Sequence, residues 1–256
     1  MIHTTAIISD KAHLASDVTV GPYAVIGDEV EIGSGSRIDS HVVINGPTSI
    51  GKDNHIYQFA SIGDDPQDKK YAEEATRLVI GDRNTNREFC TISRGTVQDR
   101  GETTIGDDNW IMAYVHIAHD CVVGSKTIMA NNTTLAGHVH VGDWVICGGF
   151  SGIHQFCRVG AHAFLGMYSA VNRDIPAYTL VSGSPATARG INSEGLKRRD
   201  FTAEQIRNIK TAYRLTFRKG NKLADAIDEV AELSQQHPEL LVFLESLRSS
   251  ERGLVR

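Results

Sequence analysis

The sequence predicts a solenoid of short parallel β-strands followed by a small α-helical domain. Two observations lead to this expectation. An apolar residue recurs at every sixth position through most of the first 171 residues, and after Pro176 helix signals replace that period. A period of six is a multiple of the strand period of two and does not match the helical period of 3.6. The chain is therefore expected to be a repeat protein.

The hexad repeat begins at the N-terminus and returns in the second half of the solenoid. The apolar positions are Ile2, Ile8, Leu14, Val20, Ile26, Ile32, Ile38, Ile44, Ile50, Ile56 and Ile62, and then Ile105, Ile111, Ile117, Val123, Met129, Leu135, Val141, Cys147, Ile153, Val159, Leu165 and Val171. Glycine often follows the apolar residue, which suits a tight corner. Three hexads would make one triangular coil, stacked about 4.8 Å from the next by strand hydrogen bonds.

Two interruptions break the period, near residues 63–79 and 97–104. Between them Asn86 stands where an aliphatic residue is expected, so that coil is predicted to be less regular. Long loops in a solenoid are more often functional than idle. We predict a solenoid over residues 1–183 that carries these two loops.

The remaining residues, 184–256, have the signals of a helical domain. Thr202 and Gln205 form a capping box that opens a helix to about Arg218. Residues 222–236 supply a second helix, and Pro238 in a first turn begins a third. A short helical turn is expected around residues 194–199.

Composition limits the function classes. A formal charge of -5 and a pI near 6.1 argue against a nucleic-acid binder. No signal peptide and no apolar run of membrane-spanning length is visible, so the expected location is the cytoplasm. Cys147 lies on the main repeat position, and Cys90, Cys121 and Cys157 lie four residues after one, so all four are expected to pack in the core. We expect no metal and no cofactor.

Polar residues converge on one predicted corner of the solenoid. Residues eighteen apart should stack on successive coils, which gives the columns His119–Gly137–Gln155, Asp120–His138–Phe156 and Ala118–Ala136–His154. These are non-core positions of the repeat. Their clustering favours a functional site over incidental surface histidines.

The residue types at this corner suit acid–base chemistry. His119 is a suitable general base because an imidazole ordinarily titrates near physiological pH. The adjacent Asp120 could fix its tautomer and stabilise the imidazolium. A glycine at 137 leaves a backbone N–H accessible to a developing oxyanion. Because no G-x-S-x-G elbow is present, we expect direct attack by a substrate hydroxyl or amine, without an acyl-enzyme.

The six-residue period resembles the left-handed parallel β-helix of hexapeptide-repeat acyltransferases, and several segments resemble the acyl-carrier-protein-dependent UDP-N-acetylglucosamine O-acyltransferases that begin lipid A synthesis in bacteria. These segments are Ile56–Gly63, Gln67–Tyr71, Arg94–Val97, Ala118–Asp120, Asn131–Asn132, Leu135–Val139, His154–Cys157 and Asn192–Arg199. The left-handed twist is adopted from this resemblance, since parallel crossovers are right-handed in about 98% of cases.

The resemblance implies a homotrimer with active sites in clefts between neighbouring solenoids. It also implies that His119 is the base and Asp120 its orienting acid. The 3-hydroxyl of UDP-N-acetylglucosamine would lose its proton to His119 while it attacks the thioester of a 3-hydroxyacyl acyl carrier protein. The Gly137 N–H would hold the oxyanion.

Further residues take substrate-binding roles by the same resemblance. Asp68 and Lys70 would contact the sugar and acyl groups, and His116 and His138 would hold the glucosamine. The uridine and diphosphate would be bound by Gln155, Asn192, Glu194, Arg198 and Arg199. His154 belongs to the same corner.

Met167 corresponds to the position that ends the acyl channel in this family. A methionine there implies a hydroxyacyl chain of roughly ten carbons, because extra side-chain volume displaces methylenes in a packed tunnel. Arg207, Lys210, Arg214 and Arg218 share one face of the first long helix, where they could steer an acidic carrier protein.

One departure and three alternatives stay open. Ser93 replaces the family's usual histidine, which leaves a 3-amino acceptor sugar possible. A zinc hydratase of the carbonic-anhydrase type on the same solenoid would use His116, His119, His138 or His154 as ligands. A related N-acyltransferase of the same pathway would carry an additional N-terminal domain before its solenoid. This alternative is disfavoured because the repeats here begin at Ile2. A non-catalytic scaffold is disfavoured by the histidine corner.

Overall fold

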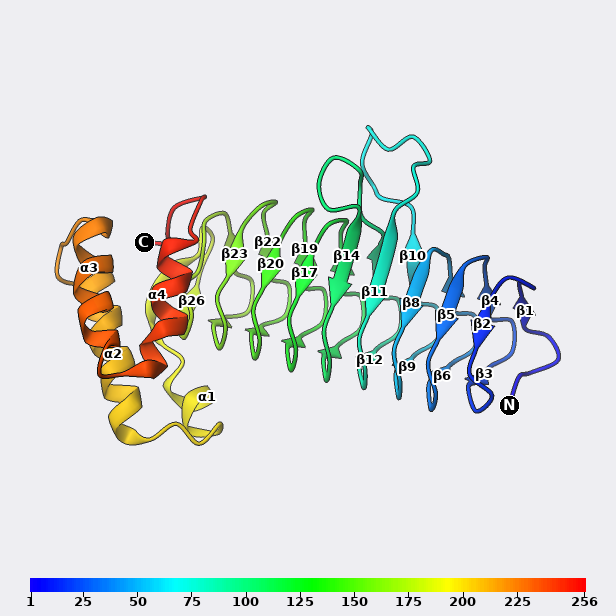
Figure 1. Cartoon of the computed structure of the whole chain (residues 1–256), viewed down its shortest axis with the longest axis horizontal. Coiled ribbons are helices and arrows are strands. Elements are labelled where there is room, and N and C mark those ends of the chain that lie inside the picture. The colour runs from blue at the N-terminus through cyan, green and yellow to red at the C-terminus, as the bar shows by residue number, and fades with distance from the viewer.

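The computed structural model describes all 256 residues as a long triangular solenoid with helices at its C-terminal end (Figure 1). Its strands form three sheets, in which neighbouring strands are parallel except for the last pair in the chain. Sheet 1 consists of β1 (Ile7–Ile8), β4 (Val25–Ile26), β7 (Val43–Ile44), β10 (Ser61–Asp64), β13 (Thr91–Ser93), β16 (His116–Ile117), β19 (Thr134–Leu135), β22 (Gly152–Ile153) and β25 (Ala170–Val171).

The other two sheets complete the triangle. Sheet 2 consists of β2 (His13–Leu14), β5 (Val30–Ile32), β8 (Thr48–Ile50), β11 (Arg77–Ile80), β14 (Glu102–Ile105), β17 (Val122–Val123), β20 (His140–Val141) and β23 (Arg158–Val159). Sheet 3 consists of β3 (Thr19–Val20), β6 (Arg37–Ile38), β9 (His55–Ile56), β12 (Thr85–Asn86), β15 (Trp110–Ile111), β18 (Ile128–Met129), β21 (Ile146–Cys147), β24 (Phe164–Leu165), β26 (Thr179–Ser182) and β27 (Thr187–Ile191).

The register confirms the coil of eighteen residues. His116 pairs with Thr134, which pairs with Gly152, which pairs with Ala170. From Val20 to Val171 the hexad residues are buried and belong to one core cluster of 39 residues along the axis, whereas Ile2 is exposed and Ile8 and Leu14 are partly buried. All four cysteines are free and buried in the core, as predicted.

The three edges of the prism carry different residues and are named here for what they hold. The histidine edge joins sheet 1 to sheet 2 and includes residues 118–121, 136–139 and 154–157. The helix edge joins sheet 2 to sheet 3 and includes residues 124–127, 142–145 and 160–163. The methionine edge joins sheet 3 back to sheet 1 and includes residues 112–115, 130–133, 148–151 and 166–169.

Both loops leave the solenoid at the histidine edge, one coil apart (Figure 1). The first occupies residues 65–76, between β10 and β11, and the second residues 94–101, between β13 and β14. They differ from the predicted ranges because Arg77–Ile80 pairs in register with Glu102–Ile105, so residues expected in loops extend the strands. Asn86 keeps the register between Ile56 and Ile111, but its buried amide has no hydrogen-bond partner.

The C-terminal part packs against the last coils. β27 pairs antiparallel to β26, so a segment assigned from sequence to the helical domain in fact extends sheet 3. The helices are α1 (Ser193–Lys197), α2 (Ala203–Phe217), α3 (Leu223–Ser234), the 3-10 turn η1 (Pro238–Leu240) and α4 (Leu241–Arg248). The predicted Thr202–Gln205 capping box is present. No helix has both the length and the apolar character needed to cross a membrane.

Candidate active site

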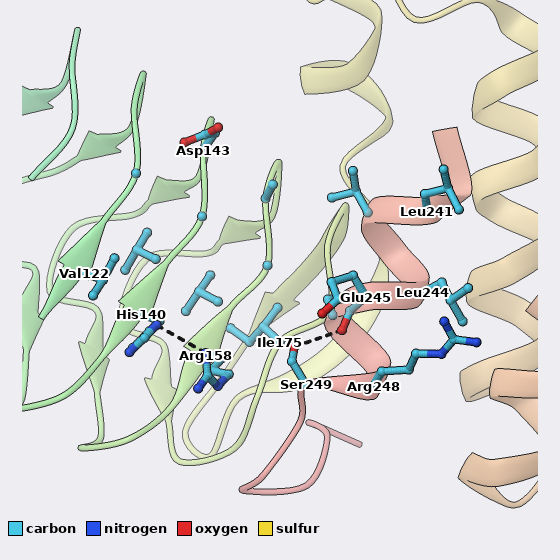
Figure 2. A pocket seen from close by; sticks show the side chains of 18 residues that line it. Val122, His140, Asp143, Arg158, Ile175, Leu241, Leu244, Glu245, Arg248 and Ser249 are labelled. Carbon is cyan, nitrogen blue, oxygen red and sulfur yellow. Dashed lines mark hydrogen bonds between the residues drawn. The ribbon is translucent and has the colours of Figure 1, made fainter. Parts of the chain in front are cut away.

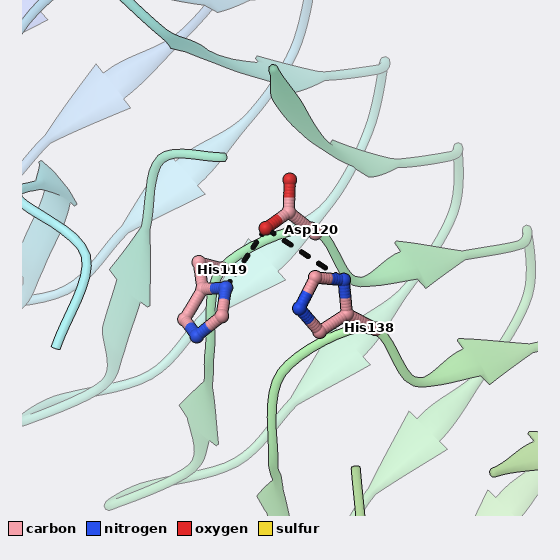
Figure 3. Close-up of side chains that lie close together, drawn as sticks. All are labelled: His119, Asp120 and His138. Carbon is pink, nitrogen blue, oxygen red and sulfur yellow. Dashed lines mark hydrogen bonds and ion pairs between the residues drawn. The ribbon is translucent and has the colours of Figure 1, made fainter. Parts of the chain in front are cut away.

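The histidine edge brings His119 and Asp120 into a hydrogen-bonded pair (Figure 3). The Nδ1 of His119 lies 2.8 Å from Oδ2 of Asp120. Two neighbours in sequence can face each other here because Asp120 has a φ of 59°, the left-handed conformation that turns the chain at the corner. If Asp120 accepts from Nδ1–H, the proton is absent from Nε2, which is then free to accept one.

The second loop fixes the carboxylate of Asp120, which is fully buried. The N–H of Thr96 donates to Oδ1 at 2.9 Å, and its hydroxyl donates to Oδ2 at 2.6 Å. Burial alone would raise the pKa of the Asp120 carboxyl. The hydrogen bonds from His119 and Thr96 outweigh burial and place this pKa below its ordinary value. The carboxylate therefore stays ionised beside the imidazole.

His138 lies one coil further along the same edge and has its own carboxylate partner. Its Nδ1 is 2.7 Å from Oδ2 of Asp99 in the second loop and 3.8 Å from Oδ2 of Asp120. The rings of His119 and His138 meet edge to face with centroids 5.0 Å apart. On its other side His138 stacks on Phe156 at 4.3 Å. The edge thus holds two histidine–aspartate pairs side by side.

Gly137 directly precedes His138, lies one coil from His119 and has no room for a side chain. A Cβ at this position would lie 2.6 Å from Cε1 and 2.8 Å from Nε2 of His119. The Gly137 N–H has no hydrogen-bond partner within the chain. A free backbone donor beside the reactive nitrogen of a histidine is the arrangement that stabilises an oxyanion.

The two loops fold over this edge and are fastened to each other. The guanidinium of Arg94, in the second loop, donates to the Gly63 carbonyl at 2.7 Å and to the Tyr71 hydroxyl at 3.0 Å, and it pairs with Asp65. A pocket of about 370 Å³ results. It is lined by Asp68, Lys70, Gln98, Asp99, His138, His140, Phe156, Arg158 and Glu251.

His116 and His154 flank this arrangement on either side. The Nδ1 of His116 lies 2.7 Å from the Thr91 hydroxyl, and burial, together with the nearby His119, lowers the pKa of His116. His154 shares its coil with Gln155 and lies 3.4 Å, Nδ1 to guanidinium, from Arg252 of the C-terminal tail. Gln155 is exposed on the same edge.

The remaining predicted site residues lie on other edges. Arg199 packs at the helix edge, where its guanidinium lies 2.9 Å from Nδ1 of His162 and donates to the Trp144 carbonyl at 2.8 Å. Asn192 is buried as the N-cap of α1. Glu194 and Arg198 are exposed on α1. Met167 lies on the methionine edge with 63% of its surface exposed. One chain does not bring these residues to His119.

A metal site is poorly matched by the edge. His119, Asp120 and His138 offer ligand atoms within 4.8 Å of one another. However, both Asp120 oxygens already accept hydrogen bonds, and His116 and His154 are not part of the cluster. The three-histidine set of the hydratase alternative is therefore not formed within one chain.

Sequence reasoning missed two residues that hold the site. Thr96 stands in a segment that carried the resemblance, Arg94–Val97, but no period indicated its contact with Asp120. Asp99 lies in the same irregular loop. A second cavity of about 710 Å³ lies between sheet 2 and α4 (Figure 2). It shares His140 and Arg158 with the first pocket and contains none of the predicted site residues.

Comparisons with known proteins show the family of the chain. A family model described as "Udp N-acetylglucosamine O-acyltransferase; Domain 2" matches residues 174–255, and the bacterial transferase hexapeptide model matches residues 11–46 and 102–137. An acyl-[acyl-carrier-protein]–UDP-N-acetylglucosamine O-acyltransferase from Thiobacillus denitrificans is 60% identical over 255 residues, covering 100% of this chain and 99% of the relative. The chain belongs to the UDP-N-acetylglucosamine O-acyltransferase family.

Solved structures of the family have the same fold. The UDP-N-acetylglucosamine acyltransferase of Francisella novicida matches with a TM-score of 0.98 at 43% identity, covering 100% of this chain and 94% of that one. The enzyme of Moraxella catarrhalis also matches with a TM-score of 0.98, at 48% identity and 100% and 99% coverage. The fold is the left-handed parallel β-helix that the resemblance predicted, followed by a C-terminal helical part.

Proposed function

We propose that this chain transfers a 3-hydroxyacyl group from an acyl carrier protein thioester to the 3-hydroxyl of UDP-N-acetylglucosamine, the first step of lipid A biosynthesis. The observation that carries the proposal is the His119–Asp120 pair beside the unpartnered Gly137 N–H, in a chain that matches enzymes named for this reaction over its full length. We also propose that the reaction takes place in the cytoplasm.

The mechanism uses His119 first as base and then as acid. Its Nε2 takes the proton of the sugar 3-hydroxyl as that oxygen forms a bond to the thioester carbonyl carbon. The tetrahedral oxyanion accepts a hydrogen bond from the Gly137 N–H. When the carbon–sulfur bond breaks, the imidazolium gives its proton to the leaving thiolate. Asp120 stabilises the imidazolium throughout through the 2.8 Å contact to Nδ1.

Substrate recognition extends along the histidine edge in this proposal. His116 and His138 hold the glucosamine, while Asp68 and Lys70 contact sugar and acyl groups from the loop above. Gln155 and His154 continue the same edge towards the C-terminus. The pocket shared by Asp68, Lys70 and His138 supports this arrangement.

The proposed site is completed by another copy of the chain. Asn192, Glu194, Arg198 and Arg199 would contact the uridine and diphosphate, yet the first three belong to α1 or its caps, and Arg199, directly after the C-cap, packs at the helix edge. A homotrimer with clefts between solenoids would place α1 of one chain against the histidine edge of the next. Buried Asn192, which also donates to the His162 carbonyl at 3.0 Å, would act mainly by holding α1 in place.

Met167 would set the length of the acyl chain at roughly ten carbons. Sheet 1 spans from the histidine edge to the methionine edge, and its outward column His116, Thr134, Gly152 and Ala170 becomes small towards Met167. An acyl chain that starts at His119 could cross this small-residue face and end at the exposed methionine.

The test is turnover of UDP-N-acetylglucosamine with 3-hydroxyacyl carrier proteins by the wild type and His119→Ala. Removing a positioned base should lower kcat by about 10²–10⁴-fold. Binding of UDP-N-acetylglucosamine and the melting temperature should change little. Near-normal turnover in a folded variant would refute the mechanism. Loss of wild-type turnover in chelator, regained with zinc, would instead favour metal chemistry.

A further inference from the structure

Residues eighteen apart stack on successive coils, and this spacing adds one more coil to the histidine edge. Val171 pairs in register with Ile153, so residues 172–174 continue the corner formed by residues 154–156. Arg173 therefore follows Gln155 in the column of His119 and Gly137. At about 4.8 Å a coil, Arg173 lies roughly 14 Å from His119 along the axis.

Asp174, the last residue of the segment 172–174, is buried and anchors the C-terminal tail. Its Oδ2 accepts hydrogen bonds at 2.9 Å from the Ser250 hydroxyl and from the backbone N–H groups of Glu251 and Arg252. Its Oδ1 accepts from the Arg158 N–H at 2.8 Å. The tail also pairs with the solenoid through Asp174 and Leu254. We call residues 250–252 the C-terminal turn.

The anchored C-terminal turn places the guanidinium of Arg252 beside the histidine edge, in addition to that of Arg173. Arg252 approaches His154 at 3.4 Å, and neither Arg252 nor Arg173 is paired with a carboxylate. Glu251 instead approaches Arg158, at 3.6 Å. An open pocket of about 600 Å³ is lined by His154, Asn172, Arg173, Glu251 and Arg252. In a chain of net charge -5, two unpaired arginines on one wall of a pocket form a local anion trap.

We propose that Arg173 and the C-terminal turn form a phosphate subsite of the active site, in which the Arg173 and Arg252 guanidinium groups bind a phosphate oxyanion of a substrate whose reacting atom lies at His119. The inference rests on the proposed function. Guanidinium groups match phosphate oxygens in charge and geometry. Both substrates carry such a group: the acceptor a nucleoside diphosphate, the donor the phosphodiester of its phosphopantetheine arm.

The experiment compares Arg173→Gln, Arg252→Gln and the double variant. The hydrogen bonds from Arg252 to Asp174 use its backbone N–H, so the turn should keep its place when the side chain changes. Arg248→Gln, an exposed change on the neighbouring helix, is the matched control. Each single variant loses a charge-assisted hydrogen bond to phosphate and should raise the KM of the phosphate-bearing substrate by about tenfold, which corresponds to about 1.4 kcal/mol. Saturated kcat should change much less.

Two donors distinguish the source of the phosphate. If the subsite binds the donor arm, the penalty on KM disappears with acyl-pantetheine, which lacks the phosphate, and the KM of UDP-N-acetylglucosamine is unchanged. If it binds the nucleotide, the KM of UDP-N-acetylglucosamine rises with either donor. A folded double variant with both KM values within about twofold of wild type would overturn the proposal.

Equilibrium binding separates this inference from the proposed function. Calorimetry with UDP and with 4′-phosphopantetheine needs no turnover. Weaker binding of either ligand to the double variant than to Arg248→Gln supports the subsite, even if the wild type were to show no acyl transfer. Equal affinities for both ligands would count against it, whatever the kinetics.

Discussion

Replacing Gly137 with alanine tests the geometry of the histidine edge most directly. The added Cβ would lie 2.6 Å from Cε1 and 2.8 Å from Nε2 of His119. Non-bonded carbons rest at about 3.5–4.0 Å, so the imidazole must retreat by roughly 1 Å. A 1 Å misplacement of a reacting group can cost about 10²-fold in rate. We expect kcat for acyl transfer to UDP-N-acetylglucosamine to fall by about that factor in Gly137→Ala.

The control is Gly190→Ala, because a Cβ at Gly190 meets nothing within 4 Å. Thermal unfolding of both variants shows how much of the loss comes from overpacking, which costs about 1–3 kcal/mol. The decisive comparison is kcat in the temperature range where both variants are folded. A Gly137→Ala enzyme whose kcat stays within about twofold of Gly190→Ala would show that His119 is not the reacting group in this position.

Three further outcomes follow from the contacts at and beside the edge. Thr96→Val removes the hydroxyl donor to buried Asp120 and should cost about 1.5–3 kcal/mol at neutral pH. Because Asp120 has a lowered pKa in the folded chain, its stabilisation is present above the unfolded pKa and is lost as the pH falls through the folded pKa. The stability gap between wild type and Thr96→Val should therefore shrink in acid, as denaturation curves at several pH values would show; a constant gap contradicts the assignment. Asp99→Ala should raise the KM of UDP-N-acetylglucosamine about fivefold to tenfold through loss of the His138 contact, with kcat less affected. Met167→Gly should shift the ratio of activities on C14 and C10 donors towards C14, and an unchanged ratio would exclude the ruler.

The repeat could be predicted because its cause is local and regular. Each hexad buries one apolar residue, so the period of the sequence is the period of the strands, and the columns through His119, His138 and Gln155 follow from it. The capping box at Thr202 could also be predicted from the sequence, because its two reciprocal hydrogen bonds join residues only three positions apart.

The contacts made by irregular segments could not be predicted. Thr96 and Asp99 reach Asp120 and His138 from a loop without a period, so no arithmetic relates their positions. The return of residues 250–252 to Asp174 spans more than seventy residues of chain. Handedness also required the family resemblance, because the usual preference of parallel crossovers points the other way.

Asp120 and His138 take a backbone conformation that recurs at the corners of the solenoid, for example at Tyr114 and Asn132. Both residues have positive φ, 59° and 63°, where a residue with a Cβ is strained and glycine is not. Substitution of Asp120 by glycine would relax the backbone, but it would also remove the carboxylate that Thr96 and His119 contact and abolish the chemistry. Each coil contacts only its neighbours, so the structural effect of such a substitution stays confined to one coil and the two beside it. The solenoid is a framework on which evolution can erase or rewrite a reaction without rebuilding the protein.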